Sequence, residues 1–285
     1  ALAVGKNGPV KTVQSDGTNG VKVIKTATPK EDGNGEATID MEAYVTGTVT
    51  STTQSTPLDI VLVLDQSGSM AGDRLEGLKT AVTNFINTIT ADATKHNVDH
   101  RIAVVGFAGG EYHTDTYYYA NTELFVGARQ YNYKKDGKES TDNSNGNLAA
   151  NHYTDAFQTV TDETGKSNLT QSIDSLAAKG GTHPELGMEM ANGIFAANPV
   201  ETGTRQRIVV MFTDGNPGDS SDGKFDKNVA NATVAQAYKT KRTYGATVYT
   251  VGLISDPGDQ VTKFLSKVSS NYPDAKTYEG PYSHS

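Results

Sequence analysis

Several apolar runs in the chain have the length and composition of strands that are buried on both faces. The clearest covers residues 60–64, with the sequence Ile-Val-Leu-Val-Leu and no polar residue. A continuous run of this kind is typical of a strand in a parallel sheet. On this basis, strands are predicted at residues 59–64, 101–107, 207–213 and 246–253.

Between these runs, apolar residues recur at steps of three and four residues, which is the spacing of one face of a helix. The stripes are Leu75, Leu78, Val82, Phe85 and Ile89 in the first helix, Leu186, Met190 and Ile194 in a middle one, and Val261, Phe264, Leu265 and Val268 in the last. Pro184 suits the first turn of the middle helix. Asp73, followed three residues later by Glu76, resembles a capping box at the start of the first. Alternating strands and helices predict an α/β fold, in which helices cover both faces of a mostly parallel sheet.

Residues 1–57 follow a different pattern, without a helical period and rich in Thr, Gly and Lys. Strands are predicted at residues 21–25 and 39–45, joined by a turn at residues 32–35. Because two strands alone are only marginally stable in water, this part needs a cover for its apolar face. We therefore divide the chain into a short β-rich segment at residues 1–57 and an α/β domain at residues 58–285.

A long stretch at about residues 108–155 interrupts the alternation of strands and helices. It has no helical pattern, yet it holds seven of the fourteen tyrosines. Long segments of this kind in compact domains are usually functional or disordered, and we interpret it as an inserted arm. Its tyrosines either contact a partner or pack the arm onto the domain. The candidate ligand-binding tyrosines are Tyr117, Tyr118, Tyr119, Tyr131 and Tyr133.

Composition narrows the possible partners and compartments. The formal net charge of -8 argues against nucleic acid or an anionic membrane as the main partner. The absence of cysteine excludes disulfides and thiolate metal sites. No apolar run has the length of a transmembrane helix, and no signal peptide pattern is present. The abundance of Gly, Thr, Asn, Asp and Ser fits many secreted bacterial proteins.

Oxygen-bearing side chains follow the predicted strands at their carboxyl ends. Asp65, Ser67 and Ser69 come directly after the first strand, Thr182 precedes a predicted helix, and Asp214 follows another strand. In open α/β sheets, ligands bind beyond this edge. Carboxylate and hydroxyl oxygens suit Mg²⁺, with Mn²⁺ or Ca²⁺ as alternatives, rather than zinc or copper. Because neutral hydroxyls offset little of the ion's charge, the bound ion can still take a carboxylate from a partner.

Each of these fragments has a plainer interpretation when taken alone. Asp and Ser are favoured at helix starts without any metal, Thr182 can be an N-cap, and Asp214 can be an ordinary turn acid. Their joint occurrence carries the prediction of a cation site. No histidine is placed by the sequence as a base for Ser67 or Ser69, and the loop lacks the G-x-S-x-G pattern. No catalytic residue and no enzymatic activity are therefore predicted. His183 is either a ligand-binding residue or a bystander.

The motifs D-x-S-x-S, G-G-T and T-D-G stand at residues 65–69, 180–182 and 213–215, in that order. With them the chain resembles a von Willebrand factor A domain that carries a metal-ion-dependent adhesion site, over about residues 58–280. The resemblance implies a Rossmann-like fold. It also implies a cation site whose partner group is typically a Glu or an Asp.

The β-rich start, the inserted arm and the lack of cysteine together resemble the A-domain adhesins at the tips of Gram-positive pili. In that group the A domain is inserted into a β-sandwich, so residues 1–57 are expected to form its first half in a longer protein. The resemblance implies an extracellular, virulence-related module at the cell surface or pilus tip. Its expected partners are a host matrix protein, such as collagen or fibronectin, and pilus backbone subunits.

Two further hypotheses come from related proteins. Strand lysines in pilin sandwiches can form an amide crosslink with an Asn, which makes Lys22 and Lys25 candidate isopeptide lysines; alternatively, both are solvated strand residues. A different class of function is an assembly module, in which the A domain docks onto another subunit of a bacterial complex, as in chelatase-type A-domain proteins. The β-rich segment and the arm favour adhesion over assembly.

Overall fold

The structure is a computed structural model of the chain. It describes residues 55–108, 157–178, 180–218, 223–253 and 258–284. For the strands at 10–14, 20–29, 37–46, 119–120, 131–132 and 152–153 it describes the backbone alone.

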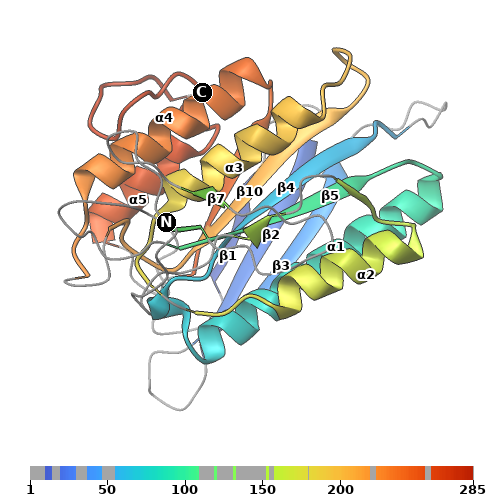
Figure 1. Cartoon of the computed structure of the whole chain (residues 1–285), viewed down its shortest axis with the longest axis horizontal. Helices are drawn as coiled ribbons and strands as arrows, with labels where there is room; N and C mark the ends of the chain where they lie inside the picture. The colour runs from blue at the N-terminus through green and yellow to red at the C-terminus, as the bar shows by residue number, and fades with distance from the viewer. Residues whose placement is uncertain are drawn as a thin grey trace.

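A mostly parallel sheet forms the centre of the α/β domain (Figure 1). Its parallel strands are β4 (Leu58–Asp65), β5 (Arg101–Phe107), β10 (Gln206–Thr213) and β11 (Thr247–Gly252), in the order β11-β10-β4-β5. The short strands β8 (His152–Tyr153) and β9 (Gln158–Thr159) both pair antiparallel with β5 at the edge of the sheet. The predicted parallel strands and the α/β fold are confirmed.

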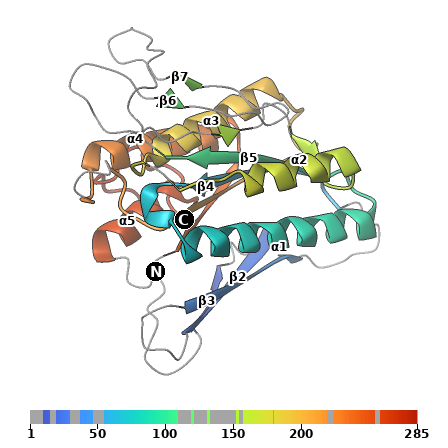
Figure 2. The ribbon, with the colours of Figure 1, turned by 60° about the horizontal axis from the view of Figure 1, so that its bottom comes forward.

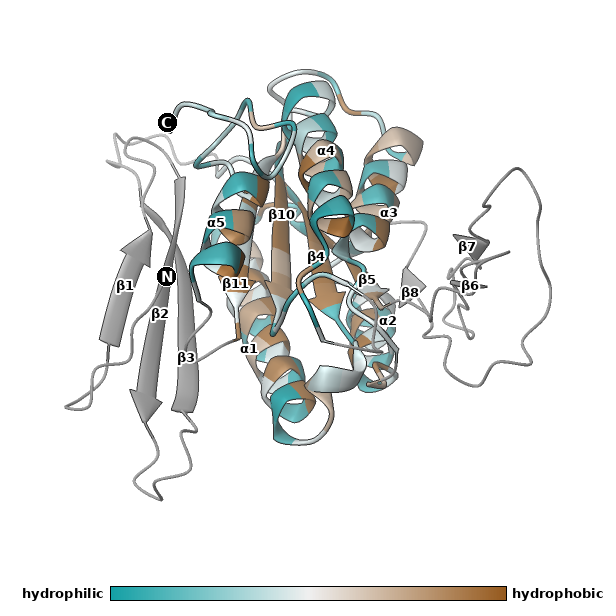
Figure 3. Ribbon diagram, turned by 90° about the vertical axis from the view of Figure 1, so that its left-hand side faces the viewer, coloured by the Kyte–Doolittle hydropathy of each residue, from teal (hydrophilic) through white to brown (hydrophobic). Residues whose placement is uncertain are grey.

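Helices cover both faces of this sheet, as predicted (Figure 1). They are α1 (Asp73–His96) and α2 (Glu163–Asp174) on one face, and α3 (Pro184–Ala197), α4 (Lys227–Thr243) and α5 (Gly258–Val268) on the other. Successive residues of a strand point to opposite faces, so Leu62 packs in the core under α1 whereas Val61 and Val63 pack in the core under α3. Figure 3 shows the apolar strands enclosed by helices whose outer faces are polar.

The start of α1 differs from the prediction. Asp73 is the first residue of the helix, and the N-cap is Gly72, whose φ of 79° turns the chain out of the short 3₁₀ helix η1 (Gly68–Met70). The predicted capping box is therefore wrong, because Asp73 lies inside the helix rather than at its cap. Asp73 and Glu76 instead place acidic groups in the first turn, near the positive end of the helix dipole.

The N-terminal segment forms a separate antiparallel sheet with the order β1-β2-β3. Its strands are β1 (Val10–Gln14), β2 (Gly20–Pro29) and β3 (Ala37–Thr46). Both predicted strands are confirmed, and β1 is an addition that makes the sheet three-stranded. The backbone of β3 lies beside α1 (Figure 2). In β2, Lys22 pairs with Tyr44 and Lys25 with Met41, but their side chains lie outside the description, so the isopeptide bond stays a prediction.

Only short backbone pieces of the predicted arm are described. Strand β6 (Tyr119–Ala120) pairs antiparallel with β7 (Tyr131–Asn132). The side chains of Tyr119 and Tyr131 are outside the description, as are the whole residues Tyr117, Tyr118 and Tyr133. Among the helices of the described part of the chain, none has both the length and the hydrophobicity required to span a membrane.

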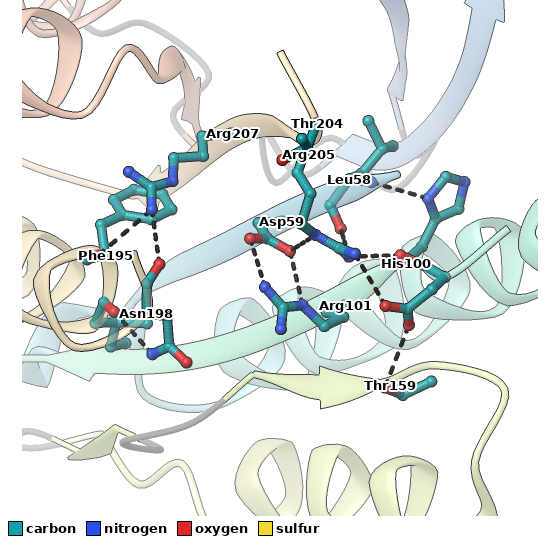
Figure 4. Close-up of polar contacts among 12 residues, drawn as sticks. Leu58, Asp59, His100, Arg101, Thr159, Phe195, Asn198, Thr204, Arg205 and Arg207 are labelled. Atoms are coloured by element: carbon teal, nitrogen blue, oxygen red, sulfur yellow. Dashed lines mark hydrogen bonds and ion pairs between the residues drawn. The ribbon is translucent and has the colours of Figure 1, made fainter. Parts of the chain in front are cut away.

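An ionic cluster around the buried carboxylate of Asp59 holds the amino-terminal edge of the main sheet (Figure 4). Asp59, the second residue of β4, is fully buried. It accepts hydrogen bonds from Arg101 Nε and Nη2 at 2.8 and 2.7 Å, and from Arg205 Nε at 2.6 Å. Arg205 Nη1 also donates to Asp99 Oδ2 at 2.9 Å. This cluster ties the start of β4 to β5 and to the segment that precedes β10, at the opposite end of β4 from Asp65.

Candidate metal centre

The loop after β4 is built around the carboxylate of Asp65. The backbone N–H of Gln66 donates to the carbonyl of Phe107 at 2.9 Å, which continues the pairing of β4 with β5 by one residue. The N–H of Ser67 then donates back to Asp65 Oδ1 at 2.8 Å. This local bond turns the chain sharply, so that Asp65 and Ser67 lie on the same side of the loop, and both are buried.

A continuous series of polar contacts joins this loop to the end of β10. Ser67 Oγ lies 3.1 Å from Ser69 Oγ, and Ser69 Oγ donates to Asp214 Oδ1 at 2.8 Å. The hydroxyl of Thr213 donates to Asp65 Oδ2 at 2.6 Å. Because β4 and β10 are neighbouring parallel strands, their carboxyl ends bring the two acids to one edge of the sheet. The structure thus brings together four of the predicted site residues.

The loop that carries Thr182 is attached to the same cluster through its backbone. The N–H of Gly68 donates to the carbonyl of Gly180 at 2.8 Å, and Thr182 and Gly218 exchange two backbone hydrogen bonds of 2.8 Å each. Gly218 has a φ of 152°, and a Cβ at this position would lie 2.7 Å from the carbonyl oxygen of Lys224. A glycine is therefore required to hold Thr182 against the loop that follows Asp214.

The surroundings of Asp65 disfavour its ionised form. Burial, and then the nearby negative charge of Asp214, raise the pKa of Asp65 to about 6. The hydrogen bonds from Ser67 and Thr213 lower it, but they offset only part of this effect. A carboxylate that is buried next to a second acid is a common feature of functional sites.

Comparison with known proteins places this arrangement in a family. The model of the von Willebrand factor type A domain matches residues 59–157 and 129–279. The chain belongs to the von Willebrand factor type A domain family. No curated protein matches it.

Solved structures similar to this A domain include pilus proteins. The pilus adhesin SpaC of Lactobacillus rhamnosus GG, in its open conformation, is 15% identical, with a TM-score of 0.52, and the match covers 94% of this chain and 31% of SpaC. The von Willebrand domain of the type V pili tip protein Mfa5 of Porphyromonas gingivalis is 16% identical, with a TM-score of 0.48, and the match covers 76% of this chain and 88% of that one. The chain thus spans about a third of the length of SpaC, and its fold is similar to that of a pilus adhesin.

The donor set of the A domain fits a hard divalent cation. Among the described residues, no group of three or more His, Cys, Asp and Glu side chains is placed to hold a metal, so the candidate centre depends on hydroxyls. The residues that would supply oxygen ligands, directly or through water, are Asp65, Ser67, Ser69, Thr182 and Asp214. A cation between them would counter both causes of the raised pKa of Asp65, first its burial and then the repulsion from Asp214. The all-oxygen set suits Mg²⁺, Mn²⁺ or Ca²⁺.

Two residues of this site were missed from the sequence. Thr213 belongs to the T-D-G motif, yet its bond to Asp65 depends on the pairing of β10 with β4. Arg74, in the first turn of α1, donates from Nη1 to Asp214 Oδ2 and to the carbonyl of Ser69, both at 3.0 Å. Its position five residues after Ser69 is the one available signal, and that spacing alone does not indicate a partner far along the chain.

His183 lies beside Thr182 but faces the interior. It is 2% exposed, and its Nδ1 lies 2.7 Å from Glu185 Oε1. Because almost none of the His183 side chain is exposed, the hypothesis that His183 contacts a ligand is weakened.

Cation binding by the A domain is expected to depend on pH. With a pKa of about 6, Asp65 is ionised at pH 7 and above and becomes protonated as the pH falls. Because a cation requires the ionised carboxylate, its affinity should change little between pH 7 and 8 and fall about tenfold per pH unit below pH 6. Calorimetric titration with Mn²⁺ at pH 5, 6, 7 and 8 measures this. An affinity that is constant down to pH 5 would contradict the raised pKa.

Proposed function

We propose that this A domain is an extracellular adhesion module that uses a divalent cation, Mg²⁺ or else Mn²⁺ or Ca²⁺, to hold an acidic group of a partner. The observation that carries the proposal is the convergence of Asp65, Ser67, Ser69 and Asp214 in one set of contacts, with the Thr182 loop tied to it. Hydroxyl ligands leave most of the ion's charge available, so a carboxylate of the partner can complete its coordination.

The fold likeness to SpaC supports a location on a pilus or on the surface of a Gram-positive cell. In such a setting, the partners on one side are pilus subunits. On the other side, the acidic group belongs to a host matrix protein such as collagen or fibronectin. The net charge of -8 favours a local, cation-mediated contact over attraction of the whole protein to an acidic partner.

The pairing of β5 supports a role of the arm in selecting the partner. It leaves the sheet after Phe107, which pairs with Asp65, and it returns in β8, where Tyr153 and His152 pair with Val105 and Gly106. Both ends of the arm are thus rooted at the edge of the sheet that carries the cation site. We infer that the cation binds a carboxylate, a group that many proteins expose. Specificity for one partner would then come from the arm.

A binding assay on immobilised collagen and fibronectin tests this function. Wild-type protein is measured with 1 mM Mg²⁺ and again with excess chelator. A second protein carries a Gly/Ser linker in place of residues 112–151, which keeps β8 paired with β5. The replacement is tolerable because the closure entropy of a loop varies slowly with its length. We expect chelator to abolish binding, and the arm variant to keep its cation affinity but lose the original partner. Binding that survives chelation would contradict the cation mechanism. If the protein binds neither collagen nor fibronectin but binds another bacterial subunit in a cation-dependent way, an assembly module is favoured instead.

A further inference from the structure

Arg74 places a positive charge next to one of the acids that would bind a metal ion at this site. Its Nη1 lies 3.0 Å from Asp214 Oδ2 and donates to the Ser69 carbonyl at the same distance. The Asp214 side chain is fully buried, whereas the Arg74 side chain is 59% exposed. The guanidinium therefore closes the site from the solvent side, and both oxygens of Asp214 are in use, Oδ1 by Ser69 and Oδ2 by Arg74.

The two acids of the site differ in what balances their charge. Asp214 has a cationic partner in Arg74. The hydrogen bonds that Asp65 accepts come from neutral donors, the Ser67 N–H and the Thr213 hydroxyl. An incoming divalent ion would therefore meet one carboxylate that is uncompensated and one that is already paired with a positive charge.

We propose that Arg74 is a built-in counter-cation that competes with the divalent ion for Asp214 and thereby weakens cation binding. This inference rests on the proposed function. If Arg74 stays in place, its charge repels the ion at short range; if it leaves, the ion pair with Asp214 is lost. Either route lowers the affinity for the cation. In the absence of a cation, the same contact offsets the repulsion between the two acids and stabilises the empty arrangement of the loops.

The substitution Arg74→Gln tests this proposal, because glutamine keeps a polar side chain but removes the positive charge. We expect Mn²⁺ and Mg²⁺ to bind about tenfold more tightly in calorimetric titrations at low salt, with a smaller gain at high salt because salt screens an exposed charge. The melting temperature in chelator should fall, and the increase in melting temperature on adding the cation should become larger. Arg74→Lys, which retains the charge, should stay within a few-fold of wild type.

Arg242→Gln provides the matched control. Arg242 is also exposed and paired with an acid, Asp274, but it lies in α4 and touches none of the site residues. The cation affinity of the Arg242→Gln variant should equal that of wild type. Weaker cation binding by Arg74→Gln would show that Arg74 positions Asp214 for the ion, and an unchanged affinity would show that the contact is incidental; both overturn the inference. A wild-type protein that binds neither cation would instead overturn the proposed function itself.

Discussion

Replacing Asp65 by asparagine is expected to abolish cation binding and, in cation-free protein at pH 7, to increase the free energy of unfolding. The folded state raises the pKa of this carboxyl from 3.8 to about 6. The folded protein therefore holds the Asp65 proton more tightly than the unfolded chain. The cost of keeping Asp65 ionised is absent below pH 4, grows as the pH rises to 6, and above that reaches up to about 3 kcal/mol. Asparagine removes this cost.

Asparagine also preserves the local geometry. Its amide oxygen can accept the hydrogen bond from the Ser67 N–H, and its amide nitrogen can donate to the Thr213 hydroxyl in place of the bond that Asp65 now accepts. The loss of cation affinity should be about 100-fold or more, because even residues that only support metal ligands cost 10- to 100-fold.

Urea denaturation of wild type and Asp65→Asn, in chelator at pH 4, 5, 6 and 7, measures the stability difference. It should be near zero at pH 4 and largest at pH 7. Asp226→Asn is the matched control, because Asp226 is the N-cap of α4, where asparagine serves as well as aspartate. A loss of stability in Asp65→Asn at pH 7 would mean that the carboxylate is already satisfied without a cation.

The second large effect is expected at the opposite end of the same strand. Asp59→Asn should lower the free energy of unfolding by about 3 kcal/mol, because it leaves the guanidinium groups of Arg101 and Arg205 without their buried counter-ion. The value lies at the lower end of the range for such changes, since Arg101 and Arg205 retain some contact with solvent. Cation affinity should not change, because Asp59 and Asp65 lie at opposite ends of β4.

Asp99→Asn distinguishes burial from charge as the source of this effect. Asp99 pairs with the same Arg205, but its side chain is 52% exposed. Its loss should therefore cost less than about 1 kcal/mol. Denaturation at pH 7 compares the two variants directly. Equal losses would show that the pairing with Arg205, and not the burial of Asp59, determines the stability of this edge.

The sequence predicted those parts of the fold whose signal lies in a few adjacent residues. A strand buried on both faces leaves an unbroken apolar run, as in β4 and β10, and a helix on one face leaves a stripe, as in α1 and α5. Helices α2 and α4 were not predicted, because their buried faces consist largely of small or polar residues, such as Ala230 and Ala237 in α4 and Ser172 in α2. The short strands β8 and β9 exist only through their pairing with β5.

The candidate site likewise contains residues that can be predicted from local sequence and contacts that depend on tertiary packing. The sequence alone determined which five oxygen-bearing residues can form it, because each follows or precedes a recognisable element and the edge of a parallel sheet brings strand ends together. Only the tertiary structure decided how Thr213, Arg74 and Gly218 take part, since their partners lie far along the chain or in another loop. The raised pKa of Asp65 was likewise decided there, because burial and the proximity of Asp214 are properties of the packed domain and not of the motif.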